Sequence, residues 1–383
     1  MKLVYCTKCV MPSTKPDLFF DGGVCDACKS TETKNKKIDW AARKKEFEKI
    51  IERYRSKDGS NYDCIIPVSG GKDSHYQVYM IKRVYGLNPL LVSFEQTYIT
   101  ELGKKNLENI RNFGCDMIYV KKNPIIYKKM VIEGFKRVGD SEWPNHLGIF
   151  TVPVNMAVKF NVPLLIWGEN PQLEYGGPAG SRERNHIDRR WLEEFGGLLG
   201  NRVEDMVGTD GITRKDLLPY FYPKDEDLKR VDVTGLFLGY YFKWDARKQT
   251  ELMMKEYGFN IKDDGPIEGT YANYENLDEA TVGIHDYLKF LKYGFGRATD
   301  HACLDIRNGR ISREEGLGLV YKYDGKYPYY GVEKLMEYTG LTKKGIDEVF
   351  DRFTNKRIFR CDKKGNLVHD IAGNLIKVNY DNE

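Results

Sequence analysis

Short apolar runs alternate with helical patterns between residues 62 and 170, and this alternation most constrains the fold. The pattern predicts strands at 62–68, 88–95, 115–120 and 162–170, and helices at 75–84, 100–114, 124–138 and 149–160. Short apolar strands separated by helices are typical of a parallel sheet with helices on both faces. We therefore predict an α/β protein built on a doubly wound parallel sheet.

The first expected strand leads into the turn Ser69-Gly70-Gly71-Lys72-Asp73-Ser74. Ligands of open parallel sheets bind beyond the carboxyl ends of the strands, so this turn lies on the expected binding edge. Its glycines allow a tight turn and a close approach to a ligand, and the N–H groups at the start of the following helix attract anions. Lys72 adds a full positive charge, and Ser69 and Ser74 add hydroxyl donors. We predict a cradle for pyrophosphate, with an ordinary capped turn as the alternative.

Four cysteines near the N-terminus have the spacing of a metal site. Cys6 and Cys9 form one C-x2-C pair, and Cys25 and Cys28 form a second. Two such pairs supply the four thiolates of a closed tetrahedral site, which suits structural Zn²⁺. An iron–sulfur cluster and four unrelated thiols are the alternatives.

Composition and pattern divide the chain into five expected segments. In order, these are the cysteine pairs (1–35), a linking amphipathic helix (36–58), an α/β domain (59–235), a helical region (236–350) and a β-hairpin tail (351–383). Residues from about 171 to 235 are rich in glycine and charge, and we interpret them as an insertion near the strand ends and a candidate substrate lid. Two Gly-Asn turn signals predict the hairpins.

Several blocks of the sequence resemble known proteins. The hexapeptide SGGKDS after an apolar strand resembles the signature of the PP-loop ATP pyrophosphatases. The longer blocks look like the N-acetyl sugar amidotransferases of the WbpG/PseA-like group, and they are CTKCVMPSTKPDLFFDGGVCDACKS, VSGGKDSHYQV, LLIWGEN and YGFGRATDHACLDIRNGRISREEG. The resemblance extends from the cysteine pairs to about residue 350.

The resemblance implies a PP-loop (HUP-like) fold and a specific reaction. Residues 69–74 would bind the phosphates of ATP, and Asp73 would help to place Mg²⁺. ATP would adenylate the carbonyl oxygen of a sugar acetamido group, and ammonia would displace AMP to form an acetamidino group in surface-glycan biosynthesis, such as that of O-antigen lipopolysaccharide or pseudaminic acid. The ammonia would come from glutaminase-like and cyclase-like partner proteins.

Three further groups of polar residues are candidates for the rest of the site. Glu169 and Asn170 follow the fourth strand, and they could hold Mg²⁺, ribose or ammonia, or could simply cap the next turn. If residues 297–310 are helical, one face carries Arg297, His301, Asp305 and Asn308. One interpretation of this face is functional: Arg297 would neutralise phosphate and His301 would transfer a proton. The alternative is a buried network of ion pairs that joins helices. The third group, in the expected insertion, is an arginine cluster that suits either an anionic sugar or solvent: Arg182, Arg184, Arg189 and Arg190, with His186 among them.

Charge and hydropathy exclude several classes of protein. The net charge of 60 − 56 = +4 is too small to suggest a nucleic-acid binder. No apolar run reaches the roughly 18 residues of a membrane span, and the start of the sequence lacks a signal peptide, so we expect a cytoplasmic protein. Two rival interpretations are a tRNA-modifying PP-loop enzyme, which would need reactive cysteines near the turn, and a zinc-knuckle interaction protein with an inactive nucleotide loop.

Overall fold

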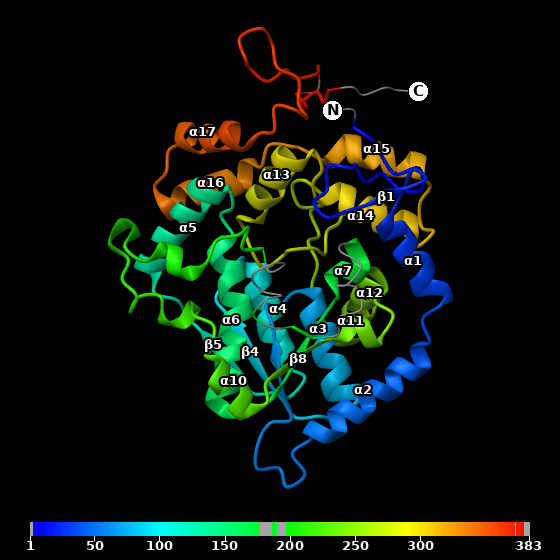
Figure 1. The fold of residues 1–383 in the computed structure, drawn as a ribbon, viewed down its shortest axis with the longest axis vertical. Coiled ribbons are helices and arrows are strands. Elements are labelled where there is room, and N and C mark those ends of the chain that lie inside the picture. The colour runs from blue at the N-terminus through cyan, green and yellow to red at the C-terminus, as the bar shows by residue number, and fades with distance from the viewer. Residues whose placement is uncertain (1–2, 177–185, 188, 190–196, 372, 379–383) are drawn as a thin grey trace.

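The structure is a computed structural model that describes residues 3–176, 186–187, 189, 197–371 and 373–378. A sheet with flanking helices forms the lower part of the molecule in Figure 1, and helices that follow residue 281 form the upper part. The N-terminal segment lies beside the upper part, next to α14 (Arg297–Arg307) and α15 (Arg313–Tyr323). The N-terminal segment therefore packs on helices from the C-terminal third of the chain.

The sheet has six strands in the order β5-β4-β3-β6-β8-β7. The first five in this order are parallel, and β7 pairs antiparallel with β8. The strands are β3 (Cys64–Pro67), β4 (Pro89–Phe94), β5 (Met117–Val120), β6 (Leu164–Trp167), β7 (His186–Ile187) and β8 (Thr234–Phe237). The predicted parallel α/β sheet is confirmed. The sequence analysis did not predict β8, because this short run contains Gly235, and glycine weakens a strand signal.

Side chains of the central strands alternate between two hydrophobic cores, as the pleat of a strand requires. Ile65 points into one core, which contains side chains from α5 (Pro124–Val138) and α6 (Trp143–Phe160). Ile66 points into the other core, which contains side chains from α2 (Trp40–Tyr54). Helices therefore cover both faces of the sheet, which makes it doubly wound.

The remaining elements complete the two layers and the upper part. A two-stranded hairpin, β1 (Phe20–Asp21) and β2 (Val24–Cys25), precedes α1. The other helices are α1 (Asp26–Lys36), α3 (Lys72–Val78) with its π-helical continuation η1 (Tyr79–Val84), α4 (Glu101–Arg111), α7 (Pro171–Tyr175), α10 (Asp225–Val231), α11 (Leu238–Tyr241), α12 (Ala246–Tyr257), α13 (Val282–Tyr293), α16 (Tyr329–Thr339) and α17 (Lys343–Phe353). Short 3-10 turns are η2 (Val203–Met206), η3 (Thr209–Gly211) and η4 (Leu218–Tyr220).

Two helical expectations need correction. Helix α6 begins at Trp143 rather than at residue 149, because Pro144 sits in its first turn, where the missing N–H has no helical partner. Residues 258–281 hold no helix, within the region 236–350 that was expected to be mainly helical. This long loop, rich in Gly, Asp and Asn, contributes to the site described below.

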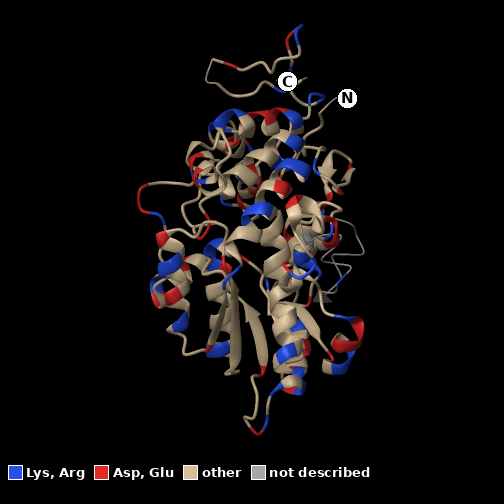
Figure 2. Ribbon diagram, turned by 90° about the vertical axis from the view of Figure 1, so that its left-hand side faces the viewer, with Lys and Arg blue, Asp and Glu red and all other residues tan. Residues whose placement is uncertain are grey.

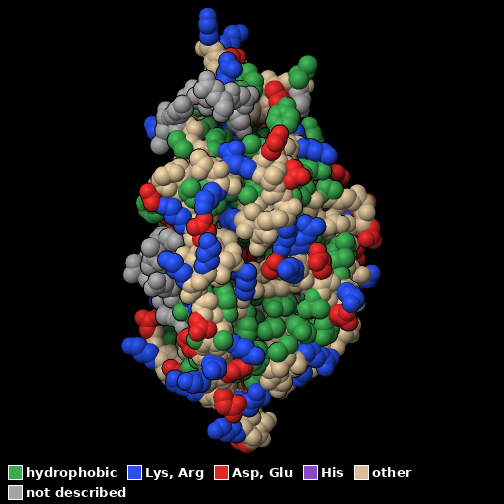
Figure 3. Space-filling model, turned by 90° about the vertical axis from the view of Figure 1, so that its right-hand side faces the viewer, with side chains coloured by type: hydrophobic (Ala, Val, Ile, Leu, Met, Phe, Trp, Pro, Cys, Tyr) green, Lys and Arg blue, Asp and Glu red, His purple; other side chains and the backbone are tan. Residues whose placement is uncertain are grey.

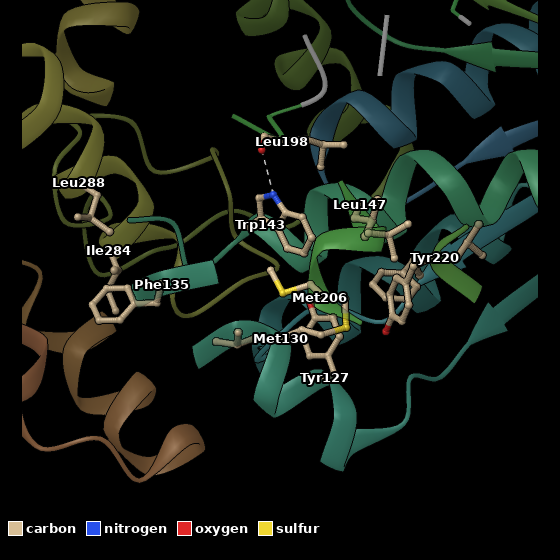
Figure 4. Packing of buried hydrophobic residues seen from close by; sticks show 14 of the residues in the cluster. Tyr127, Met130, Phe135, Trp143, Leu147, Leu198, Met206, Tyr220, Ile284 and Leu288 are labelled. Atoms are coloured by element: carbon tan, nitrogen blue, oxygen red, sulfur yellow. Dashed lines mark hydrogen bonds between the residues drawn. The ribbon is translucent and has the colours of Figure 1, made fainter. Parts of the chain in front are cut away.

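Residues 198–220 of the expected insertion pack into a hydrophobic core rather than over the cleft. Residues 198–220 contribute apolar side chains to the core around α5 and α6. Figure 4 shows Met206 and Tyr220 packed in this core and the indole N–H of Trp143 donating to the Leu198 carbonyl, at 3.0 Å. Residues 177–185, 188 and 190–196 lie outside the described residues, so a lid in that stretch stays a prediction.

The tail after α17 forms isolated antiparallel bridges, which join Phe359 to Lys377, Cys361 to Leu367 and His369 to Leu375. Each of the two Gly-Asn turns lies within one of these bridged loops.

Figure 2 shows basic and acidic residues intermixed along the helices. Figure 3 shows the same mixture on another face, with a group of hydrophobic side chains in its lower half. Among the described residues, no helix is both long and apolar enough to cross a membrane.

Candidate functional site

A cleft of about 370 Å³ lies at the carboxyl ends of the parallel strands. The floor comes from the ends of β3, β4 and β6, one wall comes from α6, and the facing wall comes from the loop 258–281 and α13. Its polar lining includes Ser69, Asp73, Ser74, Gln77, Gln96, Glu142, Asn145, His146, Glu169, Asn276, Asp278, Glu279, His285 and Arg297. The turn after the first strand of the sheet therefore opens into a cleft at the edge where such sheets bind ligands.

The turn 69–74 has a defined internal geometry. The N–H of Ser69 donates to Ser74 Oγ at 3.0 Å, and the N–H of Gly71 donates to Ser69 Oγ at 3.2 Å. Gly71 is the N-cap residue of α3, and Gly70 has a φ of +92°. A Cβ on Gly70 would lie 2.9 Å from the backbone nitrogen of Leu107 in α4, so both conformation and space require glycine there.

Lys72 is buried among carboxylates. Its Nζ forms ion pairs with Asp73 and with Glu275, which lies 3.3 Å away in the loop 258–281. Burial works against the positive charge, but Asp73, Glu275 and Glu169 outweigh it and raise the pKa of Lys72. The lysine is therefore fully charged at neutral pH, and it joins the turn to the loop that forms the facing wall.

Two carboxyl groups near the turn resist ionisation. Burial, reinforced by the carboxylate of Asp73, raises the pKa of Glu169 to about 8. Burial also raises the pKa of Asp278 to about 6, although a hydrogen bond from Ser69 acts in the opposite direction. A cation entering the cleft would favour their ionised forms, because an opposite charge lowers the pKa of a carboxyl group.

Asn170 and Glu169 have separate surroundings. Asn170 Oδ1 accepts a hydrogen bond from the N–H of Leu173 at 3.1 Å and so caps α7, which is the structural alternative considered for this pair. Glu169 lines the cleft and also a smaller cavity of about 30 Å³ next to it.

Arg297 and His301 both lie on α14, close to Glu275. Arg297 lines the cleft, and its Nε donates to both carboxylate oxygens of Asp286 at 3.1 Å. His301 lines the smaller cavity; its Nδ1 lies 2.7 Å from Thr270 Oγ1, and its Nε2 lies 3.7 Å from Glu275. Burial lowers the pKa of His301.

Further along this face, ion pairing predominates. Asp305 accepts hydrogen bonds from Tyr271 at 2.8 Å and from Arg310 at 3.0 Å. Asn308 donates to the Leu304 carbonyl of its own helix. The expected helical face exists, but its second half fits the alternative interpretation as a network that holds helix and loop together.

The four N-terminal cysteines form a buried cluster. Their sulfur atoms all lie within 4.8 Å of one another, with Cys6 to Cys28 at 3.9 Å and Cys9 to Cys25 at 3.7 Å. Four sulfurs at about 2.3 Å from a tetrahedral Zn²⁺ would be about 3.8 Å apart, so the cluster fits that ion.

Residues of α14 and α15, far along the chain, contact this cluster. Arg307 of α14 approaches Cys9 Sγ at 3.7 Å, and Arg313 of α15 donates to the carbonyls of Cys6 and Cys9. Cys303 of α14 is buried in the same hydrophobic cluster. The cysteine site therefore packs on the helix that carries Arg297 and His301.

Comparison with known proteins finds a match for the part of the chain that follows the α/β domain and supplies one wall of the cleft. Residues 268–371 match a family of LPS biosynthesis proteins. The family is described as "LPS biosynthesis protein WbpG-like, C-terminal domain", and the matched range includes Glu275, Asp278, His285, Arg297 and His301. The resemblance to the WbpG family is thus supported over this range.

One curated relative also matches. The uncharacterized protein MJ1599 of Methanocaldococcus jannaschii is 30% identical over 95 residues, which are 24% of this chain. Those residues are 33% of the relative, so the chain spans about a third of the length of the curated protein that it matches.

The sequence analysis missed two groups of residues that line the cleft or lie directly beside it. Glu275, Asp278 and Glu279 belong to the acidic run ENLDE in the loop 258–281, and that run was the available signal. The others flank the start of α6 or lie on α13: Asp140, Glu142, Asn145, His146 and His285. No motif identified this second group.

The predicted arginine cluster falls mainly outside the described residues. Arg182, Arg184 and Arg190 are among the residues not described. Arg189 pairs with Asp225 and lines a cavity separate from the cleft. His186 is described only as part of β7.

Proposed function

We propose that this chain is an ATP-dependent amidotransferase that converts the N-acetyl group of a sugar to an acetamidino group, in the biosynthesis of LPS or a related surface glycan. One observation carries the proposal: the turn 69–74 and residues of the WbpG-like range 268–371 line the same cleft. The turn suits the phosphates of ATP, and the family match of residues 268–371 connects the facing wall of the cleft with LPS biosynthesis. Neither part alone would specify the reaction.

The turn and its neighbours are proposed to bind ATP. Backbone N–H groups of residues 69–74, with the hydroxyls of Ser69 and Ser74, would hold the phosphates, and the charge of Lys72 would stabilise the departing pyrophosphate. Asp73 and Glu169 are suitable Mg²⁺ ligands, since both are carboxylates that line the cleft. Mg²⁺ would neutralise phosphate charge and draw Glu169 into its ionised form.

The chemistry explains the need for ATP. An amide carbon is a poor electrophile, and its oxygen is a poor leaving group. Attack of the acetamido oxygen on the α-phosphorus would release pyrophosphate and leave the oxygen bonded to AMP. Ammonia would then attack the carbon, and AMP would depart with the former amide oxygen. Arg297 lines the same cleft and would neutralise phosphate or a sugar acid.

His301 is proposed to act next to this site rather than in the cleft. Its Nε2 lies near Glu275, which in turn pairs with Lys72. It would transfer a proton within that group or hold Glu275 in place for Lys72.

Ammonia is proposed to come from glutaminase-like and cyclase-like partner proteins. The tRNA-modifying alternative has less support, because no cysteine among the described residues lines the cleft. Cys64 is buried within β3.

The test supplies the protein with ATP, Mg²⁺, an ammonium salt and a panel of N-acetyl sugars, both free nonulosonic acids and nucleotide-linked sugars. We expect AMP, pyrophosphate and a product lighter by the difference between O and NH. Lys72→Ala is expected to abolish turnover while the protein keeps its zinc. ADP in place of AMP, or turnover by the Lys72 variant, would contradict the proposal.

A further inference from the structure

The end of the cleft between α6 and α13 contains a histidine–carboxylate pair that the proposed function has not used. His285 Nδ1 lies 2.9 Å from Asp140 Oδ1. The Asp140 side chain is 4% exposed, and His285 lines the cleft. With Nδ1–H donated to the carboxylate, Nε2 of His285 keeps its lone pair and can accept a proton.

The charges around this pair keep Asp140 ionised. Burial opposes its charge, but the interaction with His285 outweighs burial and holds the pKa of Asp140 below its usual range. His146 Nδ1 lies 3.8 Å from Asp140 Oδ2, and burial lowers the pKa of His146 to about 4. His146 is therefore neutral at pH 7, and the aspartate charge acts on His285.

Asn145 of α6 adds a hydrogen-bond acceptor to the same end of the cleft. It is 8% exposed and lines the cleft, and its Nδ2 donates to Gln96 Oε1 at 2.9 Å and to Glu142 Oε2 at 3.0 Å. Its Oδ1 is buried and has no hydrogen-bond partner among the described residues. A buried acceptor without a donor is costly, so a ligand with N–H groups would be stabilised there.

The carboxyl groups at this end of the cleft suit a small ligand that donates N–H groups rather than an anion. Glu142 and Glu279 line the cleft beside Asn145, and their Oε1 atoms lie 3.0 Å and 2.7 Å from Thr281 Oγ1. Burial raises the pKa of Glu142 and Glu279, so the lasting negative charge beside this end of the cleft is that of Asp140. This acidic end of the cleft, rich in carboxyl and amide oxygens, would therefore accept hydrogen bonds from the N–H groups of ammonia.

We propose that this acidic end is the ammonia subsite, with Asn145 Oδ1 as the acceptor that holds ammonia and His285, oriented by Asp140, as the general base of the second step; this inference rests on the proposed amidotransferase reaction. As the nitrogen lone pair forms a bond to the activated carbon, the attacking nitrogen becomes positively charged. His285 Nε2 takes one proton from it, and the C–O bond then breaks so that AMP leaves with the electron pair. The product keeps two nitrogens on the former amide carbon.

The proton has a route out of the subsite. His285, which lines the cleft, also lines a second cavity of about 280 Å³, together with Asp140. Because Nδ1 is held by Asp140, Nε2 both accepts and releases the proton, and the second cavity brings solvent close to the ring.

The test separates the two half-reactions in the full chain. Sugar-dependent exchange of labelled pyrophosphate into ATP reports adenylation, and amidine formation with ammonium reports the second step. For His285→Gln we expect adenylation exchange within about 2-fold of the wild type and amidine formation lowered about 100-fold, which is at the lower end of general-base contributions. Asp140→Asn is expected to act like His285→Gln, with little change in adenylation exchange and slower amidine formation. Asn145→Ala is expected to raise the KM for ammonium. The control is His369→Gln, at an exposed histidine of the tail, with both steps unchanged.

The outcomes distinguish the subsite from the reaction. If His285→Gln forms amidine at the wild-type rate, or loses exchange and amidine formation equally, His285 is not the base of the ammonia step. Retained exchange also shows that the variant is folded and binds both substrates. If the wild-type protein neither exchanges pyrophosphate nor forms amidine with any sugar of the panel, the proposed function fails, and the assignment of ammonia to this subsite fails with it.

Discussion

Replacement of Lys72 by methionine tests the electrostatic design of the turn most sharply. The side chain is buried, and its Nζ lies 3.3 Å from Glu275 Oε1. At an effective dielectric constant of about 20, this single attraction is about 5 kcal/mol. Loss of one partner of a buried pair typically lowers the free energy of unfolding by about 3–5 kcal/mol. We therefore expect Lys72→Met to lose about 3–5 kcal/mol at pH 8.

The same prediction has a definite pH dependence. Burial opposes ionisation of Glu275, but Lys72 and then His301 lower its pKa. A depressed carboxyl pKa stabilises the fold above the unfolded-state value of about 4.3, and this stabilisation is lost as the pH falls. Without Lys72, the facing carboxyl groups take up protons at higher pH, which relieves their repulsion. The difference between wild type and variant should therefore be largest at pH 8 and smaller at pH 5.

The assay is unfolding followed by circular dichroism at both pH values, with Lys44→Met as the matched control. Lys44 pairs with Glu48 at 3.8 Å on the exposed side of α2, and such pairs contribute about 0.2–1 kcal/mol. The double variant Lys72→Met/Glu275→Gln should recover part of the loss. A loss for Lys72→Met no larger than that of the control, or equal at pH 5 and pH 8, would refute the reasoning.

Three further predictions concern other parts of the site. Gly70→Ala should lower the free energy of unfolding by about 1–3 kcal/mol and raise the KM for ATP, because alanine is strained at this φ and its Cβ meets the Leu107 backbone; unchanged melting and KM would contradict this. Glu169→Gln should stabilise the protein more at pH 8 than at pH 5, because a folded-state pKa of about 8 penalises the fold progressively as the pH rises above about 4.3; a pH-independent effect in thermal melting would count against that pKa. Native mass spectrometry should find one Zn²⁺ per chain, and Cys25→Ser should lose the metal and melt at lower temperature, whereas a metal-free wild type would exclude the zinc site.

The sequence predicts the sheet well because its signals are local. The strands around Ile65 and Leu91 are continuous apolar runs between turn residues, as strands buried on both faces require. Strand β8 lacks that signal, since its four residues include a glycine and its place beside β6 depends on the packing of the completed sheet.

The residues of the candidate site likewise fall into those that a local motif predicts and those that only folding brings together. Residues 69–74 lie in one continuous motif, and the cysteine spacing is itself a pattern. In contrast, Asp140 and His285 are 145 positions apart and meet only because α13 packs against the start of α6. Glu275 reaches Lys72 from a loop that has no periodicity. Sequence spacing carries no information about such contacts, so this half of the site became visible only in three dimensions.

The fate of the amide oxygen tests the central claim most directly. An N-acetyl sugar labelled with heavy oxygen in its acetamido carbonyl would be incubated with the protein, ATP, Mg²⁺ and ammonium, and the nucleotide and sugar would be analysed by mass spectrometry. The proposed adenylation predicts that each amidine formed leaves its heavy oxygen in the phosphate of AMP. Heavy oxygen found in water or inorganic phosphate, or unlabelled AMP beside an unchanged sugar, would contradict it.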